Sequence, residues 1–276
     1  MDIRERWIMT HVNKMNRILY KYYSPNALSE KYIATLNDKQ FWFGGNKIQN
    51  DPYDLIGVNE FFNTYFGQNI IKYVKDKNGD THLLRNQILQ FASCSFSRVA
   101  TERLMWAHYA NSYEGFCVAY SFSENAPLKT IIYQDKYPIR GLVFTNNVDL
   151  NIKSILEEWI RSPKIDTIKQ LIIYLSSIKS QEWVYEQEVR LVDIIPSASN
   201  GVNFPWSNYD CYALDIIFGS RFQHNLYGAR MYNILSKWNI SQSHLFEIST
   251  NALEHFEINL IPLSKQIINQ YYQLPI

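Results

Sequence analysis

The sequence predicts an α+β fold, in which helices flank a mixed, largely antiparallel sheet. Three observations favour it: several strand-like segments are short and half polar, helical segments with one apolar face lie between some of them, and the two kinds do not alternate strictly. The lack of strict alternation disfavours a doubly wound parallel sheet. With 276 residues and no repeat or low-complexity linker, the chain is expected to form one domain over residues 1–276.

Composition indicates a folded protein and narrows its partners. Hydrophobic residues make up 46% and aromatic residues 15% of the chain, more than a disordered protein carries. Acidic and basic residues are interspersed with a net charge of +1, so we expect neither general binding to duplex DNA nor capture by an anionic membrane. Widely spaced cysteines, with no export signal or membrane-spanning apolar run, predict a cytoplasmic protein.

The first part of the chain combines helix and strand signals. The predicted elements are, in order, a polar N-terminal helix, a strand over 18–23, a helix capped by Ser24-Pro25-Asn26, a strand over 41–43 broken by Gly44-Gly45, a turn over 50–54, a helix over about 56–75, and a strand over 90–96. In the capped helix, Leu28, Tyr32 and Leu36 recur near helical spacing and are expected to face inward.

The remaining chain continues the mixed pattern. The predicted elements are a helix over 101–113, a strand over 116–122, helices over about 150–161 and 166–180, strands over 180–192 and 212–218, a helix over about 222–237, and strands over 244–248 and 257–261. Gly115 is expected to end the first of these helices in a left-handed conformation. An apolar stripe is expected on the 166–180 helix, made of Ile168, Leu171, Ile172 and Leu175.

Residues 180–192 are the most informative stretch. Read as a strand, they place Glu186, Glu188 and Arg190 on one face, because alternate side chains share a face. The other face is expected to carry Trp183, Tyr185, Gln187, Val189 and Leu191. Two carboxylates beside a guanidinium could form a proton-transfer or sugar-hydroxyl-binding site, since the Arg favours an ionised carboxylate and the second carboxylate opposes it. The alternative is a solvated, charged strand face.

The helix over 101–113 adds a candidate acid or base. Helical spacing brings His108 near Arg103 and Tyr109 near Glu102, and it offers His108 as an acid, a base or a ligand-binding group. A histidine among apolar neighbours is otherwise a packing residue. No histidine lies in a metal-ligand spacing, so we expect no metal site.

Two strands add hydroxyl and amino groups. Ser93, Ser95 and Ser97 alternate on one face of their strand and could present hydroxyls to a ligand, although capping and turn chemistry explain them equally well. Lys21, beside Tyr22, could bind a phosphate while a neighbouring ring stacks on the ligand; the alternative is an edge-strand lysine.

Several motifs occur in a recognisable order. They are Leu-Tyr-Lys-Tyr at 19–22, Asn-Asp-Pro-Tyr-Asp at 50–54, Phe-Ser at 96–97, Leu-Met-Trp-Ala-His-Tyr-Ala at 104–110, Gly-Phe-Cys-Val-Ala-Tyr at 115–120, and Trp-x-Tyr-Glu-x-Glu-x-Arg at 183–190. Together they resemble the bacterial domain-of-unknown-function family 2971. The resemblance spans about residues 18–221, which leaves residues 222–276 as a C-terminal extension. Asp54 and Tyr53 depart from the Glu and Phe that are common in the family.

The order of parts is also similar to that in ADP-ribosyltransferases, including DNA- and protein-modifying toxins. This likeness implies a fold of that kind and NAD as the substrate, bound by Lys21 and Tyr22. Ser95 or Ser97 would support the nicotinamide ribose, and Glu188 would hydrogen-bond the ribose 2′-hydroxyl. The chain departs from most transferases because no Arg or His stands in the first strand expected over 18–23.

The same likeness assigns the remaining roles. Glu186 would orient an unknown macromolecular acceptor, Arg190 would hold Glu188 ionised, and His108 with Trp106 would shape the acceptor side. The candidate catalytic residues are Glu188, Glu186 and His108, and the candidate cofactor-binding residues are Lys21, Tyr22, Ser95, Ser97, Trp106, Tyr109 and Arg190. A role in bacterial conflict, as a toxin or phage-defence effector, is compatible with this assignment.

Two other classes of function stay open. In a non-catalytic ligand- or partner-binding module, the same residues would form a structural polar network, whereas an open cleft joining Lys21, His108 and Glu188 would favour an enzyme. A metal-dependent phosphodiesterase or nuclease would need clustered carboxylates for Mg²⁺. The candidates for that cluster are Asp51, Asp54, Glu186 and Glu188.

Overall fold

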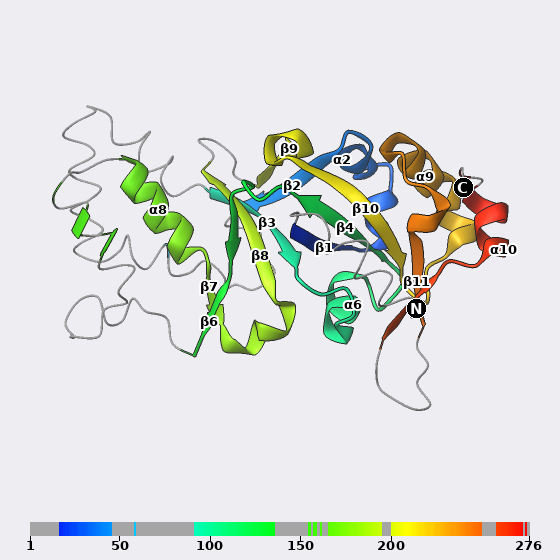
Figure 1. The fold of residues 1–276 in the computed structure, drawn as a ribbon, viewed down its shortest axis with the longest axis horizontal. Coiled ribbons are helices and arrows are strands. Elements are labelled where there is room, and N and C mark those ends of the chain that lie inside the picture. The colour runs from blue at the N-terminus through cyan, green and yellow to red at the C-terminus, as the bar shows by residue number, and fades with distance from the viewer. Residues whose placement is uncertain are drawn as a thin grey trace.

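The computed structural model describes residues 17–45, 58, 91–135, 154–155, 157–158, 161, 165–194, 200–249, 258–272 and 274. Within them the fold is α+β, as predicted: a curled, mixed and largely antiparallel ten-stranded sheet with helices around it (Figure 1). A polypeptide helix long and apolar enough to span a bilayer does not occur among these residues.

The sheet contains β1 (Arg17–Tyr23), β2 (Gln40–Gly45), β3 (Phe91–Ser97), β4 (Phe116–Phe122), β5 (Leu128–Thr130), β8 (Glu188–Ile194), β9 (Gly201–Pro205), β10 (Cys211–Phe218), β11 (Leu245–Ser249) and β12 (Asn259–Pro262). A separate parallel pair consists of β6 (Ile132–Gln134) and β7 (Ile178–Ser180). The α-helices with defined bounds in the described residues are α2 (Ile33–Asn37), α6 (Arg103–Tyr109), α8 (Ile165–Leu175), α9 (His224–Trp238) and α10 (Lys265–Ile267). Short 3₁₀ helices include η1 (Pro25–Leu28), η3 (Gln181–Glu186), η4 (Trp206–Tyr209) and η5 (Gln242–His244), and a π-helical turn, η6 (Ile268–Tyr272), follows α10.

The sheet forks at β3. One edge of β3 pairs with β8 along its whole length, so β1 and β2 must share the other edge. They meet it at different points: Tyr20 of β1 lies opposite Ser97, whereas Gly44 of β2 lies opposite Ser93. Between these two contacts the main-chain oxygen of Ser95 accepts a 3.0 Å hydrogen bond from Lys21 Nζ. The Lys21 side chain therefore satisfies a main-chain acceptor of β3 at the point between its pairings with β1 and β2.

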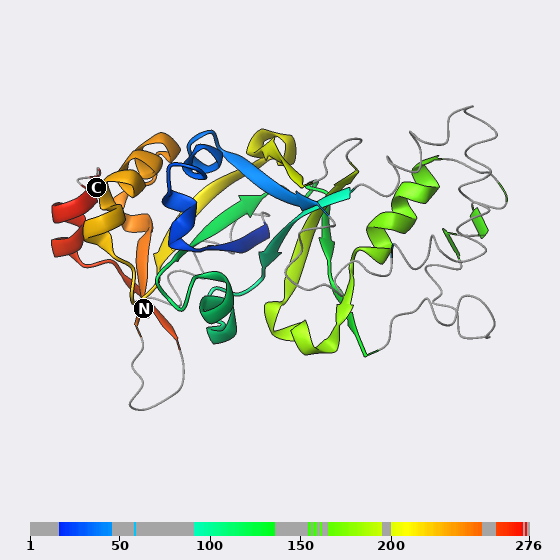
Figure 2. The same cartoon turned by 180° about the vertical axis from the view of Figure 1, so that it is seen from behind.

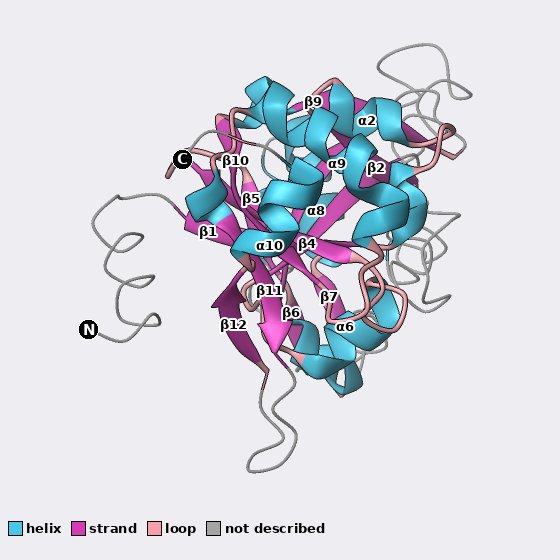
Figure 3. Cartoon of the chain, turned by 90° about the vertical axis from the view of Figure 1, so that its right-hand side faces the viewer, coloured by secondary structure: helices cyan, strands magenta, loops and turns pink. Residues whose placement is uncertain are grey.

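Apolar side chains cover both faces of the sheet. The larger cluster lies on the face covered by α2 and α9, where Leu19, Phe41 and Phe96 meet Trp238 and its neighbours (Figures 1 and 2). The smaller cluster lies on the face covered by α6, whose Trp106 packs edge-on against Tyr22 at a centroid distance of 5.2 Å (Figure 3). Alternation along β1 therefore sends Leu19 and Lys21 to one face and Tyr22 to the other.

The stretch over 180–192 is not one strand, and that prediction was wrong. The chain runs as β7, then the 3₁₀ helix η3, then β8, and Gln187 turns it in the left-handed region with φ 43°. In a 3₁₀ helix residues three apart share a side, so the alternation expected before Gln187 does not hold. From Glu188 onward it does hold: Glu188 and Arg190 share one face, while Val189 and Leu191 belong to the larger cluster.

Two predicted helix boundaries also differ. Ser24 makes no capping hydrogen bond, and the chain after it forms η1 and the short α2 in place of one helix. Leu28 and Leu36 are buried as expected, but Tyr32 is 44% exposed. The helix predicted over 166–180 ends at Leu175, with Leu171, Ile172 and Leu175 buried as the stripe predicted.

Two expectations about glycines were wrong for steric reasons. Gly44-Gly45 do not break a strand: both pair within β2, where a Cβ on Gly45 would already lie 3.4 Å from the Asn200 main chain. Gly115 does not adopt the left-handed closing conformation after α6; Asn111, Ser112 and Tyr113 do. Gly115 is required instead by close approach, because a Cβ there would lie 2.0 Å from the Tyr23 oxygen.

Several other described strands follow the predictions within a few residues, but β5, β6 and β9 were not predicted. The segments predicted over 18–23, 116–122 and 212–218 are β1, β4 and β10, and the C-terminal helix and strands are α9, β11 and β12. The predicted N-terminal helix, the turn over 50–54, all of the 56–75 helix except residue 58, and most of the 150–161 helix lie outside the described residues.

Candidate functional site

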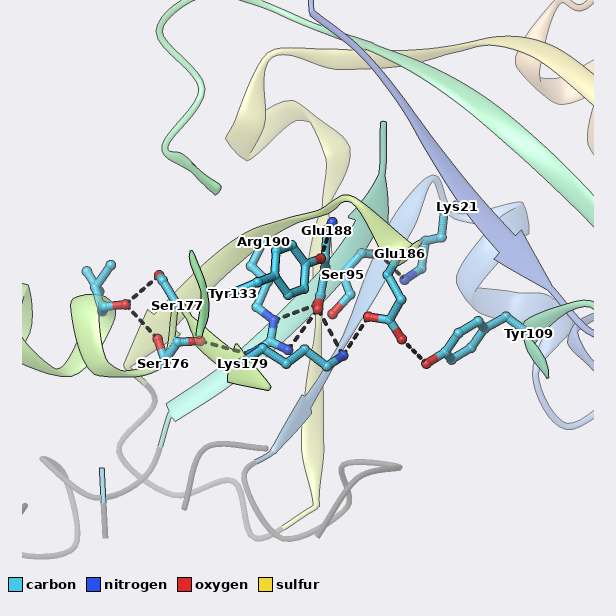
Figure 4. Close-up of polar contacts among 11 residues, drawn as sticks. Lys21, Ser95, Tyr109, Tyr133, Ser176, Ser177, Lys179, Glu186, Glu188 and Arg190 are labelled. Atoms are coloured by element: carbon cyan, nitrogen blue, oxygen red, sulfur yellow. Dashed lines mark hydrogen bonds and ion pairs between the residues drawn. The ribbon is translucent and has the colours of Figure 1, made fainter. Parts of the chain in front are cut away.

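The predicted Glu and Arg residues meet in a buried cluster at the start of β8. Pairing with β3 places Glu188 opposite Ser97 and Arg190 opposite Ser95. Glu186 is the last residue of η3, one left-handed residue before the strand, so the turn at Gln187 brings both carboxylates to the same place (Figure 4). Glu186, Glu188 and Arg190 are each less than 5% exposed, which contradicts the alternative of a solvated strand face.

Glu188 is held by two cations. Arg190 binds it in a bidentate manner, with Nε 2.5 Å from Oε1 and Nη2 3.0 Å from Oε2, and Lys179 Nζ lies 3.1 Å from Oε2. Burial alone would raise the pKa of Glu188, but the charges of Arg190 and Lys179, with hydrogen bonds from Arg190 and Ser95, lower it to about 2. With its pKa lowered in this way, Glu188 is ionised in the neutral range.

Glu186 has a different environment. Lys179 Nζ donates to its Oε2 at 2.5 Å, and the Tyr109 hydroxyl of α6 donates to its Oε1 at 2.5 Å. Burial raises the pKa of Glu186, the nearby Glu188 charge adds to that rise, and Lys179 and Tyr109 oppose it. The surroundings therefore shift the pKa values of the two carboxyl groups in opposite directions, up for Glu186 and down for Glu188.

The cluster also ties three outlying segments to the sheet. Arg190 Nη1 donates to the Ser176 oxygen just after α8 at 2.8 Å, and the amide of Glu188 donates to the Tyr133 hydroxyl of β6 at 2.7 Å. Lys179 comes from β7 and is 7% exposed. Figure 4 shows Tyr133 of β6 and Lys179 of β7 beside Glu188, and Ser176 on the far side of Arg190.

Lys179 and Tyr133 were missed by the sequence reasoning. Lys179 lies between Ile178 and Ser180 in a three-residue strand, and a charged residue flanked by a buried apolar one was its only signal. Its Nζ also lies 4.9 Å from the centroid of the Trp183 ring, a cation–π distance. No sequence pattern pointed to Tyr133, because its contact with the Glu188 amide joins residues 55 apart in the chain.

Three of the predicted cofactor-binding residues meet elsewhere, at a site we call the Val99–Ala100 hub. Tyr22 donates its hydroxyl to the Val99 oxygen at 2.8 Å, and Trp106 donates Nε1 to the Ala100 oxygen at 2.7 Å. The Ser97 hydroxyl exchanges 3.1 Å hydrogen bonds with the Val99 main chain, in agreement with the turn chemistry considered for it. These polar atoms bind the chain just before α6 and orient that helix.

Lys21 is separated from the cluster by the sheet. Its ammonium bonds the main-chain oxygen of Ser95, not the hydroxyl, and lies 5.3 Å from the Phe96 ring and 5.9 Å from the Tyr23 ring. Because β1 lies between β4 and β3, the alternative of an edge-strand lysine is wrong. Lys21 and Tyr22 point to opposite faces of β1, so the structure does not bring this predicted pair together.

His108 lies on the solvent side of the cluster. It is exposed on α6, so it is no core residue, and its ring stands 6.2 Å from that of Tyr185. Tyr185 in turn contacts Trp183 at 5.9 Å, and Tyr109 and Tyr185 are half-buried. We call these four residues of α6 and η3, His108, Tyr109, Trp183 and Tyr185, the aromatic rim. Glu186 is the carboxylate that adjoins the rim, through Tyr109.

The described part of the chain contains no group of three or more His, Cys, Asp and Glu side chains arranged to hold a metal ion. Asp51 and Asp54, which the nuclease alternative needs, lie outside the described residues.

One family model matches the chain. It is described as "Protein of unknown function (DUF2971)" and covers residues 105–191, from α6 to β8. That region holds most of the cluster and the whole rim, but it is shorter than the resemblance read from the motifs. No curated protein and no solved structure matches the chain.

Proposed function

We propose that this chain is an NAD-cleaving enzyme of the ADP-ribosyltransferase kind, with the glutamate cluster and the aromatic rim as its site. The acceptor of ADP-ribose is left open. In support, the strands that carry the expected polar residues, β1, β3 and β8, are neighbours in one sheet, and Ser95 of β3 reaches Glu188 of β8.

The observation that carries the proposal is a difference in acceptor capacity between the two glutamates. An ionised carboxylate offers about four acceptor positions. The donors to Glu188 are Arg190 Nε, Arg190 Nη2, Lys179 Nζ and the Ser95 hydroxyl. Glu186 accepts from Tyr109 and Lys179 among the described residues, so it retains positions for a substrate hydroxyl. Glu186 is therefore proposed as the carboxylate that touches the ribose, in place of Glu188.

This assignment suits the chemistry of nicotinamide release. Cleaving the glycosidic bond develops positive charge on the ribose, and an oriented carboxylate stabilises that charge more than it stabilises the ground state. Glu186 accepts from a ribose hydroxyl, while Glu188 stays paired behind it. The nicotinamide ring is planar and cationic, and the rim offers it the faces of Tyr185, Trp183 and His108.

The test follows nicotinamide release from NAD labelled in its adenylate portion, with protein, DNA and RNA offered as acceptors of the label. We expect release by the native protein, a loss of at least about 100-fold in Glu186→Gln, and no change in Glu182→Gln, an exposed glutamate of the same 3₁₀ helix. Loss in Glu188→Gln with activity kept in Glu186→Gln would restore the role first expected for Glu188. Neither release nor NAD binding by the native protein would overturn the proposal.

A partner-binding module is the second candidate, and one observation favours it. The cluster is buried and completed by the chain's own side chains, as a network that holds α8, β6 and β7 against the sheet would be. In that case Glu188→Gln should lower the free energy of unfolding by several kcal/mol while the native protein leaves NAD intact. Stability by urea unfolding and nicotinamide release, measured on the same preparations, separate the two candidates.

A further inference from the structure

Lys179 is the one cation that contacts both carboxylates of the cluster among the described residues. Its ammonium lies 2.5 Å from Glu186 Oε2 and 3.1 Å from Glu188 Oε2, and the Trp183 ring lies beside it. Lys179 is 7% exposed, and a buried ammonium group keeps its charge only where partners replace water. The two carboxylates and the Trp183 ring all favour the charged form.

The two cations of the cluster are not equivalent. The Arg190 guanidinium is committed to Glu188 and to the Ser176 oxygen. Glu186 therefore depends on Lys179 for its cationic contact, since its other donor, Tyr109, is neutral. Burial raises the pKa of the Tyr109 hydroxyl, which keeps it a proton donor over the physiological range.

We propose that Lys179 is a positioning residue of this site: by bridging Glu186 and Glu188 it holds Glu186 ionised, with its free acceptor positions directed to the aromatic rim. The proposal rests on the proposed function for its catalytic meaning, but the bridge itself can be tested without any activity. Lys179 acts through Glu186 and is not assigned a contact with substrate.

The groups around Glu186 determine the sign of the effect. Those that face it are Lys179 from β7, Tyr109 from α6, Glu188 and Arg190 from β8, Tyr133 from β6 and Tyr185 from η3, with His108 against Tyr185. Burial and the Glu188 charge raise the pKa of Glu186, and Lys179 is the largest influence that lowers it. Removing the Lys179 charge should therefore leave Glu186 protonated at a higher pH.

The first test measures the carboxyl titration of Glu186 by NMR, on protein labelled with carbon-13 in the glutamate side chains and assigned with Glu186→Gln. We expect the Glu186 midpoint to rise by at least about one pH unit in Lys179→Met, a tenfold change in protonation. In Lys179→Arg it should stay near the native value because the charge is kept. Lys237→Met, on the exposed face of α9, is the matched control.

A double variant guards against loss of folding. Lys179→Met alone leaves two buried carboxylates beside one guanidinium, so the same substitution is also made in Glu188→Gln, where the charge is balanced. Lys179→Met should raise the Glu186 midpoint in that background too. An unchanged midpoint in either background would overturn the bridge, whatever the protein does with NAD.

The second test is the pH dependence of kcat/KM for nicotinamide release. With Lys179→Met the acidic limb should move to higher pH together with the NMR midpoint, and Lys179→Arg should restore it. An equal loss at every pH, without rescue by Arg, would show a merely structural role. Absence of release by the native protein would overturn the proposed function, while the NMR result still decides the role of Lys179 at Glu186.

Discussion

The glutamate cluster, which contains Lys179, Glu186, Glu188 and Arg190, and the Val99–Ala100 hub are two buried polar regions joined by the short helix α6. They are built in opposite ways. In the hub, neutral side chains bind main-chain atoms, as Trp106 does with Ala100 and Tyr22 with Val99. In the cluster, ionised side chains bind each other, and Tyr109 attaches α6 to Glu186.

The two kinds of interaction respond differently to pH and contribute differently to stability. A neutral hydrogen bond to a main-chain carbonyl contributes about 1 kcal/mol and does not depend on pH near neutrality. Buried ion pairs are sensitive to pH and to the loss of one partner, and they are a weak source of net stability. The hub is therefore expected to hold α6 in place. The cluster is expected to supply the ionisable groups of the proposed site, next to that helix.

The largest effect is expected from Trp106→Ala in the hub. Trp106 is fully buried, and its loss leaves a cavity under α6 and an unpaired Ala100 oxygen. We expect the free energy of unfolding to fall by about 3–5 kcal/mol, equally at pH 5 and pH 8. Urea unfolding measures it, with Leu104→Ala, 45% exposed on the same helix, as a control that should stay within about 0.5 kcal/mol. A strong pH dependence would contradict the neutral character of the hub.

Arg190→Met should have a comparable effect for a different reason. It leaves Glu188 buried with Lys179 as its remaining cation, which costs about 3 kcal/mol or more. The double variant Arg190→Met with Glu188→Leu removes both charges and should recover most of that loss. Recovery on urea unfolding would identify the uncompensated charge as the cause; two losses that simply add would point to packing.

The cluster should also give the protein a stability optimum on the acid side of neutrality. The pKa of Glu188 is lowered from 4.5 to about 2, so its stabilisation is present above pH 4.5 and lost as the pH falls toward 2. The pKa of Glu186 is raised, so its contribution is present below pH 4.5 and lost as the pH rises through the folded-state value.

The two contributions together predict greatest stability near the unfolded-state pKa of both residues. Unfolding free energies measured from pH 2 to 8 give the profile, and Glu186→Gln should remove the decline on the alkaline side of the optimum. An unchanged alkaline decline in that variant would assign it to other groups.

The sequence predicted the strands better than the contacts between them. The main strands follow local rules: the alternation over 18–23 and the apolar run over 116–122 identify strands that the structure confirms. The hub was not predicted, because its residues were expected to bind a cofactor and Tyr22 reaches Val99 across 77 positions of the chain. Glu186, Glu188 and Arg190 were expected to lie together, but on a continuous strand. The left-handed turn at Gln187, for which the sequence carried no glycine, changes how they meet.

The partners of the cluster were beyond local rules. Lys179 reaches Glu186 and Glu188 across η3 from a separate two-stranded sheet. Tyr133, which accepts from the Glu188 amide, lies 55 positions before Glu188 in the chain. Such contacts depend on which segments pack together, and periodicity along one segment does not report that. The same applies to Lys21, whose role at the fork of the sheet follows from a topology that its own strand does not reveal.

The smallest effects compare one hydroxyl from each region. Tyr22→Phe removes a neutral hydrogen bond to Val99 and should cost about 1 kcal/mol at any pH from 5 to 8. Tyr109→Phe removes a donor to Glu186 and should cost somewhat more, about 1–2 kcal/mol at neutral pH, where Glu186 most needs donors. Below pH 4.5 its cost should approach that of Tyr22→Phe, because Glu186 is then protonated. Parallel urea unfolding of the two variants at pH 4 and pH 7 measures this difference, and an equal cost at both values for Tyr109→Phe would mean that Tyr109 is only a packing contact like those of the hub.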